Sequence, residues 1–334
     1  MPPGVAAVGT AAGGGTAADE GTLRRVSQQD ARGPWLVTFA ATLWALDAPF
    51  RKHLTIDLSS TSIVLMEHLM VAVCILPLFV RRLGELRNLG WKEWFAVIFI
   101  GIGGSALATI LFTQSFHYLN PTVAILLQKM QPLIAILLAA VVLREHVSRT
   151  FWLWAAVALG GAYVISFPDL KPAGFAWTPN TRGTMLALGA AVFWGGSTVF
   201  GRFALNRVSF QMTTSLRFLS AVVFLPFLSL YEGTLHEVGA ASAADWFFVF
   251  MTAILAGLVS LLIYYYGLRS TKASIATMCE LAYPFASTII NWAVLGATLA
   301  PLQIAGGSVL LVAIARLTVV NNRETRTVAT AASY

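Results

Sequence analysis

The sequence contains few charged residues and almost no cysteine. Only 11% of its 334 residues are Asp, Glu, Lys or Arg, against roughly 25% in ordinary soluble domains. So few charges do not cover the surface of a soluble chain of this length, which excludes an arrangement of two or three soluble domains. Cys74 and Cys279 each lie in an apolar stretch, so neither a disulfide framework nor a thiolate metal site is expected.

The sequence also lacks the motifs of enzymes and metal sites. It contains no nucleophile–base pair, no HExxH and no Walker-type loop, and its histidines do not have metal-ligand spacing. We therefore expect no catalytic activity, no metal and no cofactor. The net charge of +7 is not gathered into one basic stretch, so a nucleic-acid partner is not expected either.

What the sequence does contain is long apolar runs, since 57% of its residues are hydrophobic. Runs of roughly 20 residues suit helices that cross a hydrocarbon core about 30 Å thick, and these runs do not alternate as barrel strands do. The sequence predicts an all-α integral membrane protein with ten transmembrane helices. The runs are 34–53, 60–80, 91–117, 121–143, 150–167, 183–205, 209–231, 245–268, 273–297 and 300–319.

Lys and Arg are distributed unevenly between the segments that join these runs. With the N-terminus inside, the cytoplasmic segments carry 16 of the 22 Lys and Arg residues, whereas the external segments carry Arg51, Lys52, Lys171 and Arg182. Because cytoplasmic loops are enriched in Lys and Arg, both termini are predicted to be cytoplasmic. Residues 1–32 and 320–334 are predicted to be cytoplasmic tails, the first of them flexible.

The two halves of the chain resemble each other. Residues 33–167 and 183–319 each contain five runs, and the polar external segment 168–182 joins them. An odd number of runs makes the second half enter the membrane from the opposite side, as in the inverted repeats of secondary transporters that alternate access around a midplane site. At offsets of about 150 residues, the matched positions are Trp44 and Trp194, Pro77 and Pro226, Trp94 and Trp246, and Pro132 and Pro284.

Two sets of five spans, a Trp near the middle of spans one and six, and the two prolines Pro132 and Pro284 resemble the drug/metabolite transporter superfamily, and within it the EamA-type branch. The stretch 120–145 is the most similar part, although its last residue, Glu145, corresponds to Ala297 in the second half. The resemblance implies a transporter in the inner (plasma) membrane. It also implies export of amino acids or related metabolites through a central cavity.

Several ionisable residues lie inside the runs, where a charge at the helix centre costs about 2.5 to 3.5 kcal/mol. One interpretation is fixed ion pairs that join Lys129 to Asp47 or Glu67, and Arg217 to Glu280. The other makes Lys129 an anchor for an anionic substrate group, and gives the acidic residues a role in gating or in carrying a coupling proton. The residues are Asp47, Glu67, His68 and Lys129 in the outer half, and Arg217 and Glu280 in the inner half.

The predicted binding site lies where Pro132 and Pro284 interrupt their helices. Each proline frees a carbonyl group about one turn earlier, and polar residues at such breaks are expected to form a midplane site. The candidate residues near the two breaks are Gln128, Lys129, Gln131, Glu280 and Tyr283.

Aromatic residues allow two readings. Trp44 and Trp194 lie close to the midplane, where they either pack between helices or form an aromatic wall of the cavity. Tyr264 lies near the end of its run, and an interfacial aromatic belt is the expected place for it.

The leading hypothesis is a secondary transporter of amino acids or small amphiphilic metabolites. Its expected partners are the substrate and the lipid bilayer, with a monomer as the simplest state. An antiporter of phosphorylated metabolites or nucleotide sugars would need several cavity cations, and only Lys129 and Arg217 are available at membrane depth. A membrane-bound enzyme would need the missing catalytic residues, and a receptor would not explain an inverted repeat.

Overall fold

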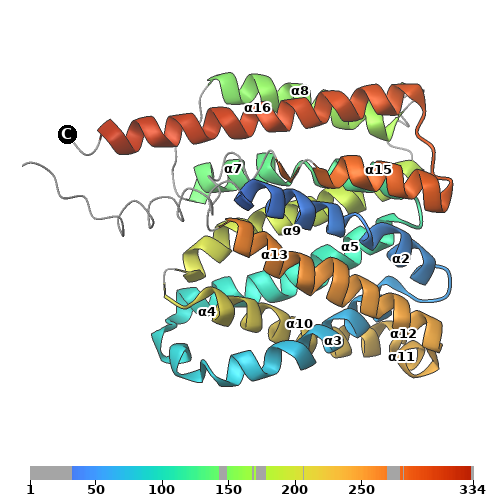
Figure 1. Cartoon of the computed structure of the whole chain (residues 1–334), viewed down its shortest axis with the longest axis vertical. Helices are drawn as coiled ribbons and strands as arrows, with labels where there is room; N and C mark the ends of the chain where they lie inside the picture. The colour runs from blue at the N-terminus through green and yellow to red at the C-terminus, as the bar shows by residue number, and fades with distance from the viewer. Residues whose placement is uncertain are drawn as a thin grey trace, which may run out of the picture.

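The computed structural model describes residues 32–142, 149–167, 169–170, 178–205, 207–268, 279–280 and 282–331. Within these residues every regular element is a helix, as the sequence predicts, and the helices lie side by side across the long axis of the molecule (Figure 1). Six helical segments in this part of the chain are long and apolar enough to cross a membrane. They are Ser60–Val80, Trp91–Ser115, Pro121–Leu138, Pro179–Gly201, Phe210–Glu232 and Ala243–Tyr264, and a shorter apolar helix covers Pro301–Leu317.

The first half of the chain begins with a helix over residues 32–44. The elements that follow are α2 (Asp47–Leu54), α3 (Ser60–Val80), η1 (Leu83–Asn88), α4 (Trp91–Ile98), η2 (Phe99–Leu107), α5 (Ala108–Ser115), α6 (Pro121–Gln128), α7 (Gln131–Val142) and α8 (Arg149–Ser166).

The second half contains α9 (Pro179–Leu205), α10 (Phe210–Glu232), α11 (Leu235–Ala240), α12 (Ala243–Phe250), η3 (Met251–Val259), α13 (Ser260–Leu268), α15 (Ala282–Leu295) and α16 (Pro301–Ala331). Described helices therefore lie in all ten predicted runs. The helix α9 begins inside the segment 168–182 that the sequence assigns to a linker. The polar segment from residue 320 continues α16 as far as Ala331, and residues 1–31 of the N-terminal tail lie outside the described residues.

A rare helical form occurs at corresponding places in the two halves. The segments η2 (Phe99–Leu107) and η3 (Met251–Val259) are both nine-residue π-helices, and they are separated by the same 152 residues as Pro132 and Pro284. Segments of π-helix are uncommon and are frequently found at functional sites. Their recurrence indicates that the repeat extends from the sequence to the local backbone.

The helices α3 and α10 pack against each other in opposite directions. The backbone N–H of Ser59, at the start of α3, donates to Glu237, which follows the end of α10. The backbone N–H of Ser209, at the start of α10, donates to Glu85, which follows the end of α3. Each helix therefore begins where the other ends, and Figure 1 shows the two lying side by side.

The helices α8 and α16 form a separate layer at one end of the molecule (Figure 1). Their backbones approach closely because both helices present glycine at the contact. A Cβ atom on Gly161 would lie 2.8 Å from the backbone N of Leu310 and 2.9 Å from the carbonyl O of Gly306. The largest buried cluster of apolar side chains extends from this layer through α6 and α9 to the helix over residues 32–44.

Candidate functional site

Three helical segments are interrupted shortly before a proline. A proline cannot donate to the carbonyl one turn earlier, and its ring crowds that carbonyl. Before Pro49 the chain turns at residues 45–46, and before Pro132 it turns at residues 129–130. Before Pro284, the N–H of Tyr283 bonds to the carbonyl of Glu280 at 3.1 Å, in the tighter i to i−3 pattern. The two breaks predicted at Pro132 and Pro284 are present. The break before Pro49 was not predicted from the sequence.

The three breaks place side chains from separate helices around one group of rings, which we call the central cluster: Trp44, Lys129, Tyr264, Glu280 and Tyr283. The ring of Trp44 lies 5.3 Å from that of Tyr264 and 6.4 Å, edge on, from that of Tyr283. The Nζ atom of Lys129 lies 4.7 Å from the centre of the Tyr283 ring, a cation–π contact. The hydroxyl of Tyr264 donates to Glu280 at 2.5 Å.

The central cluster combines flat apolar surfaces with two opposite charges. Tyr283 is buried, whereas Trp44, Lys129, Tyr264 and Glu280 are partly buried. Lys129 and Glu280 lie within electrostatic reach of each other. Such an arrangement can stack a planar group and can bind polar groups at its edge.

The remaining predicted cavity residues are Trp194, Gln128 and Gln131, and the first and last of them meet at Thr198. The ring of Trp194 is 5.3 Å from that of Phe112, and the backbone carbonyl of Trp194 accepts a hydrogen bond from Thr198. Gln131 donates to the same Thr198 at 3.4 Å, and Gln128 has a buried Oε1 atom without a hydrogen bond. Trp44 and Trp194 both pack against the main apolar core, so their packing role is present whether or not they also contact a substrate.

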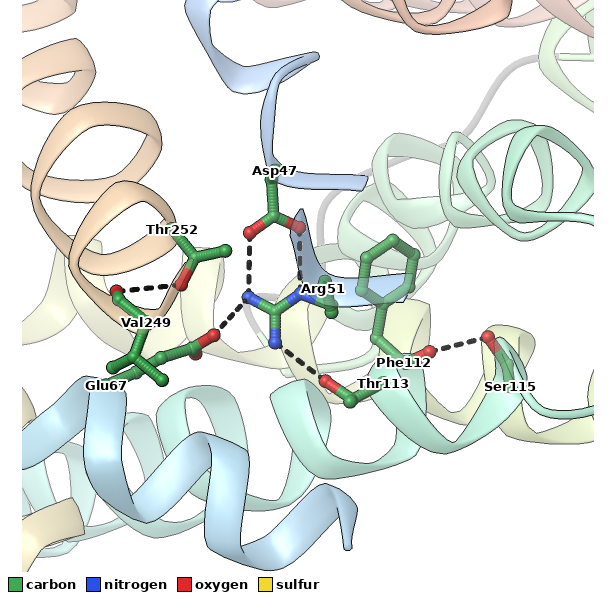
Figure 2. Close-up of polar contacts among 8 residues, drawn as sticks. All are labelled: Asp47, Arg51, Glu67, Phe112, Thr113, Ser115, Val249 and Thr252. Carbon is green, nitrogen blue, oxygen red and sulfur yellow. Dashed lines mark hydrogen bonds and ion pairs between the residues drawn. The ribbon is translucent and has the colours of Figure 1, made fainter. Parts of the chain in front are cut away.

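A second polar group, the arginine cluster, contains Asp47, Arg51, Glu67 and Thr113 (Figure 2). Arg51 forms two parallel bonds of 2.8 Å to the carboxylate of Asp47, one turn earlier on α2. Its Nη1 atom donates to Thr113 at 2.7 Å, and its Nη2 atom lies 2.9 Å from Oε1 of Glu67. This last contact is an ion pair without hydrogen-bond geometry, so one guanidinium faces two carboxylates in a buried position.

The arginine cluster corrects the ion pairs expected from the sequence. Asp47 and Glu67, proposed as partners of Lys129, both bind Arg51. Arg51 itself was assigned to an external segment, but only 6% of its surface is exposed. Asp47 and Arg51 lie four residues apart inside an apolar run, a spacing that brings two side chains together on a helix. This spacing is the sequence signal from which the pair could have been predicted.

The other two charged candidates contact neighbouring helices. Arg217 of α10, expected to pair with Glu280, instead donates to the hydroxyl of Ser105 at 3.0 Å and to the carbonyl of Gly104 at 3.2 Å, both in the π-helix η2. Glu280 accepts from Tyr264. His68 bonds through Nδ1 to the carbonyl of Val64, one turn earlier, and its buried Nε2 atom has no hydrogen bond.

Tyr264 is the other residue that the sequence places wrongly. Its position near the end of an apolar run indicated an interfacial belt, and this environment fits Tyr266, which is 63% exposed. Tyr264 instead contacts Trp44 and Glu280. The orientation of one tyrosine in a run of three depends on the rotation of the helix, which the sequence pattern does not specify.

Comparison with known proteins identifies the family. The model of the EamA-like transporter family matches residues 31–167 and again residues 181–319. The chain belongs to the EamA-like transporter family. This EamA-like chain is therefore a multi-pass membrane transporter built from two repeats, rather than an enzyme.

Three comparisons place this EamA-like transporter among its relatives. It is 29% identical to the riboflavin transporter ImpX of Fusobacterium nucleatum, over 87% of this chain and 98% of that protein. It is 24% identical to an uncharacterized transporter of Archaeoglobus fulgidus, over 68% of this chain and 79% of that protein. A solved crystal structure of a protein with 18% identity shares the fold, with a TM-score of 0.58 over 87% of this chain and 97% of the other.

Proposed function

We propose that the protein is a secondary transporter with ten transmembrane helices, arranged as two five-helix repeats of inverted topology. The antiparallel packing of α3 and α10 supports the inversion, because these helices occupy equivalent places in the two repeats. Transport by alternating access follows from this symmetry. The excess of Lys and Arg in one set of loops supports cytoplasmic termini in the inner (plasma) membrane.

We propose a small planar aromatic metabolite of the flavin type as the substrate. The observation that carries this proposal is the central cluster, in which the rings of Trp44, Tyr264 and Tyr283 meet beside Lys129. Stacking on such rings favours a flat heterocycle, and a few polar groups at its edge fix its orientation. The likeness to a riboflavin transporter along almost the whole of that protein supports the same class.

Export of amino acids, which the family resemblance implies, is the second candidate. It is favoured by the opposite charges of Lys129 and Glu280, which lie within electrostatic reach of each other. These two side chains could bind the carboxylate and the ammonium group of one zwitterion. This second candidate includes the direction of transport, which is export. Flux measured in vesicles of known orientation tests that direction.

Counterflow in proteoliposomes separates the two substrates. We expect labelled riboflavin to exchange in vesicles that contain the wild-type protein, and Trp44→Leu and Lys129→Met to reduce this exchange at least tenfold. Trp35→Leu is the matched control, because Trp35 lies on the same helix and is 76% exposed. Exchange of amino acids without riboflavin would support the second candidate, and exchange of neither would overturn both.

We also propose that the arginine cluster takes part in gating or coupling, with Glu67 as the proton carrier. Among the described residues, Glu67 shares the guanidinium of Arg51 with Asp47, so two carboxylates face one cation in a buried position. The charged groups that face it are Arg51 and Asp47, whereas Arg217 lies nearer to His68. An imposed pH gradient should alter flux in the wild type and not in Glu67→Gln; no effect on the wild type would exclude this role.

A further inference from the structure

The two repeats carry equivalent groups of residues at the candidate site, but one of these groups is incomplete. Positions separated by 150 to 152 residues correspond in the two halves, as the prolines and the π-helices establish. By this rule the central-cluster residues Trp44, Tyr264, Glu280 and Tyr283 correspond to Trp194, Phe112, Gln128 and Gln131. We call the second set the second half-site.

The aromatic pairs in the two sets have the same separation, although their ring planes are inclined at 41° in the first and at 61° in the second. Trp44 lies 5.3 Å from Tyr264, and Trp194 lies 5.3 Å from Phe112. Each pair joins one repeat to the other, since the tryptophan and its partner ring come from different halves of the chain. The second half-site therefore has a tryptophan-centred ring pair like that of the first, but it has Gln131 in place of the third ring, Tyr283.

The polar contacts of the two sets differ. In the central cluster the hydroxyl of Tyr264 donates to the carboxylate of Glu280. In the second half-site the corresponding ring is Phe112, which has no hydroxyl, and the Oε1 atom of Gln128 is buried without a hydrogen bond. A buried acceptor without a donor destabilises a fold, and native proteins retain few of them.

Gln128 also lies at one of the helix breaks of the candidate site. It is the last residue of α6, at the break before Pro132, and the next residue is Lys129, whose ammonium group lies over Tyr283 of the central cluster. Consecutive residues at one helix break therefore belong to the two half-sites, Gln128 to the second and Lys129 to the central cluster.

We propose that the substrate supplies the missing donor. An N–H or O–H group on the edge of a planar substrate donates to Oε1 of Gln128. Gln128 is then a specificity-determining residue that selects substrates with a hydrogen-bond donor at this edge. This inference rests on the proposed transport of a small metabolite. It assigns to Gln128 the recognition of an N–H or O–H group of that metabolite.

The test compares riboflavin with 3-methylriboflavin, in which a methyl group replaces the imide hydrogen. A site built to bond a donor rejects the analogue that lacks it. We expect the wild-type protein to bind riboflavin at least tenfold more tightly than the methylated compound in equilibrium binding. Gln128→Leu should bind riboflavin at least tenfold more weakly than the wild type and should no longer distinguish the two compounds.

A second variant uses the symmetry of the repeats. Phe112→Tyr introduces the hydroxyl that the other repeat has at Tyr264, which gives Gln128 a donor within the protein. We expect this variant to keep or raise the melting temperature while it weakens riboflavin binding. Thr184→Val is the matched control. Thr184 lies on the same helix as Trp194 and has another buried polar atom without a hydrogen bond. We expect the Thr184→Val variant to bind riboflavin as the wild type does.

The outcomes separate this inference from the proposed function. If the wild type binds riboflavin and Gln128→Leu binds it equally well, the role of Gln128 is overturned and the transport of flavins is not. If the wild type transports amino acids and not riboflavin, the same comparison is made with the transported amino acid and its N,N,N-trimethyl derivative, whose nitrogen carries no N–H group. If it transports neither, both proposals fail.

Discussion

Glu237 accepts a 2.7 Å hydrogen bond from the backbone N–H of Ser59, and Glu85 binds Ser209 at the same distance in the other half of the chain. Each serine is the N-cap of its helix, where backbone N–H groups lack partners and a negative charge is favoured. Each carboxylate comes from the opposite repeat. The start of α3 and the start of α10 are therefore each held by a residue of the other half.

Removing either carboxylate should destabilise the protein. We expect Glu85→Ala and Glu237→Ala each to lower the free energy of unfolding by about 1–3 kcal/mol, since each loses hydrogen bonds to a charged group. The two sites lie at opposite ends of the α3–α10 pair, so the losses should add in the double variant. Denaturant unfolding in detergent measures the effect. Glu232→Ala, at an exposed position on α10, should change little; equal losses in all three variants would contradict the prediction.

The same contacts should make stability depend on pH. Burial raises the pKa of Glu85, but hydrogen bonds from Ser209 and Arg82 outweigh this effect and hold the pKa below its ordinary value. Hydrogen bonds from Ser59 likewise hold the pKa of Glu237 below its ordinary value, against the effect of burial.

Because the folded-state pKa is lowered, the stabilisation is fully present above the ordinary pKa of about 4.5. It is lost as the pH falls through the lower, folded-state value. We expect the difference in unfolding free energy between the wild type and the alanine variants to be largest at pH 7 and to vanish in stronger acid. A difference that stays constant from pH 7 to pH 3 would show that the carboxylate charge is not involved.

Loss of Arg51 should be more damaging than loss of an exposed arginine. Arg51→Met leaves Asp47 and Glu67 buried without a cation, and breaking a buried ion pair in this way costs about 3–5 kcal/mol. The triple change Asp47→Asn, Arg51→Met and Glu67→Gln removes all three charges and should recover most of the stability. Thermal unfolding of purified protein compares these variants.

The control for this experiment is Arg207→Met. Arg207 lies 3.6 Å from Glu93, and its side chain is 64% exposed. An exposed ion pair contributes roughly 0–1 kcal/mol, so this variant should unfold close to the wild type. If the triple change were as unstable as Arg51→Met, the uncompensated carboxylates would not be the cause.

In the layer formed by α8 and α16, replacing two adjacent glycines, Gly160 and Gly161, by alanine should affect stability differently. Gly161→Ala places a methyl group against the backbone of α16, and such overpacking costs about 1–3 kcal/mol. A Cβ atom on Gly160 meets nothing within 4 Å, so Gly160→Ala should be neutral or should stabilise the helix by up to about 1 kcal/mol. The melting temperatures of the two variants should therefore change in different directions.

Part of the candidate site follows from local sequence. Pro132 and Pro284 weaken their helices one turn earlier because proline has no N–H to donate. Pro77 and Pro226 nevertheless lie inside the continuous helices α3 and α10, so the proline permits a break and does not by itself fix one. The polar residues just before each proline are then placed at a break, as the structure has them for Lys129 and Glu280. The repeat also follows from sequence alone, since its offsets are counted along the chain.

The partners of the buried charges do not follow in this way. Arg51 and Glu67 lie on different helices, and which of their atoms meet depends on how α2 and α3 are rotated and crossed. The apolar runs leave that rotation open, because lipid accepts an apolar residue on any side of a helix. A count of loop charges therefore assigned Arg51 to the outside, and the contact between Tyr264 and Glu280 was not foreseen.

The sequence by itself determined that this is a helical membrane protein with a repeat, and it marked Pro132 and Pro284 as places where a helix can break. These features depend on the length of apolar runs and on the chemistry of single residues, both of which are local. Only the tertiary structure decided that Arg51 joins Asp47 to Glu67, that three aromatic rings meet beside Lys129, and that Gln128 lacks a donor. Each of these depends on distances between helices, which are set by packing across the whole molecule.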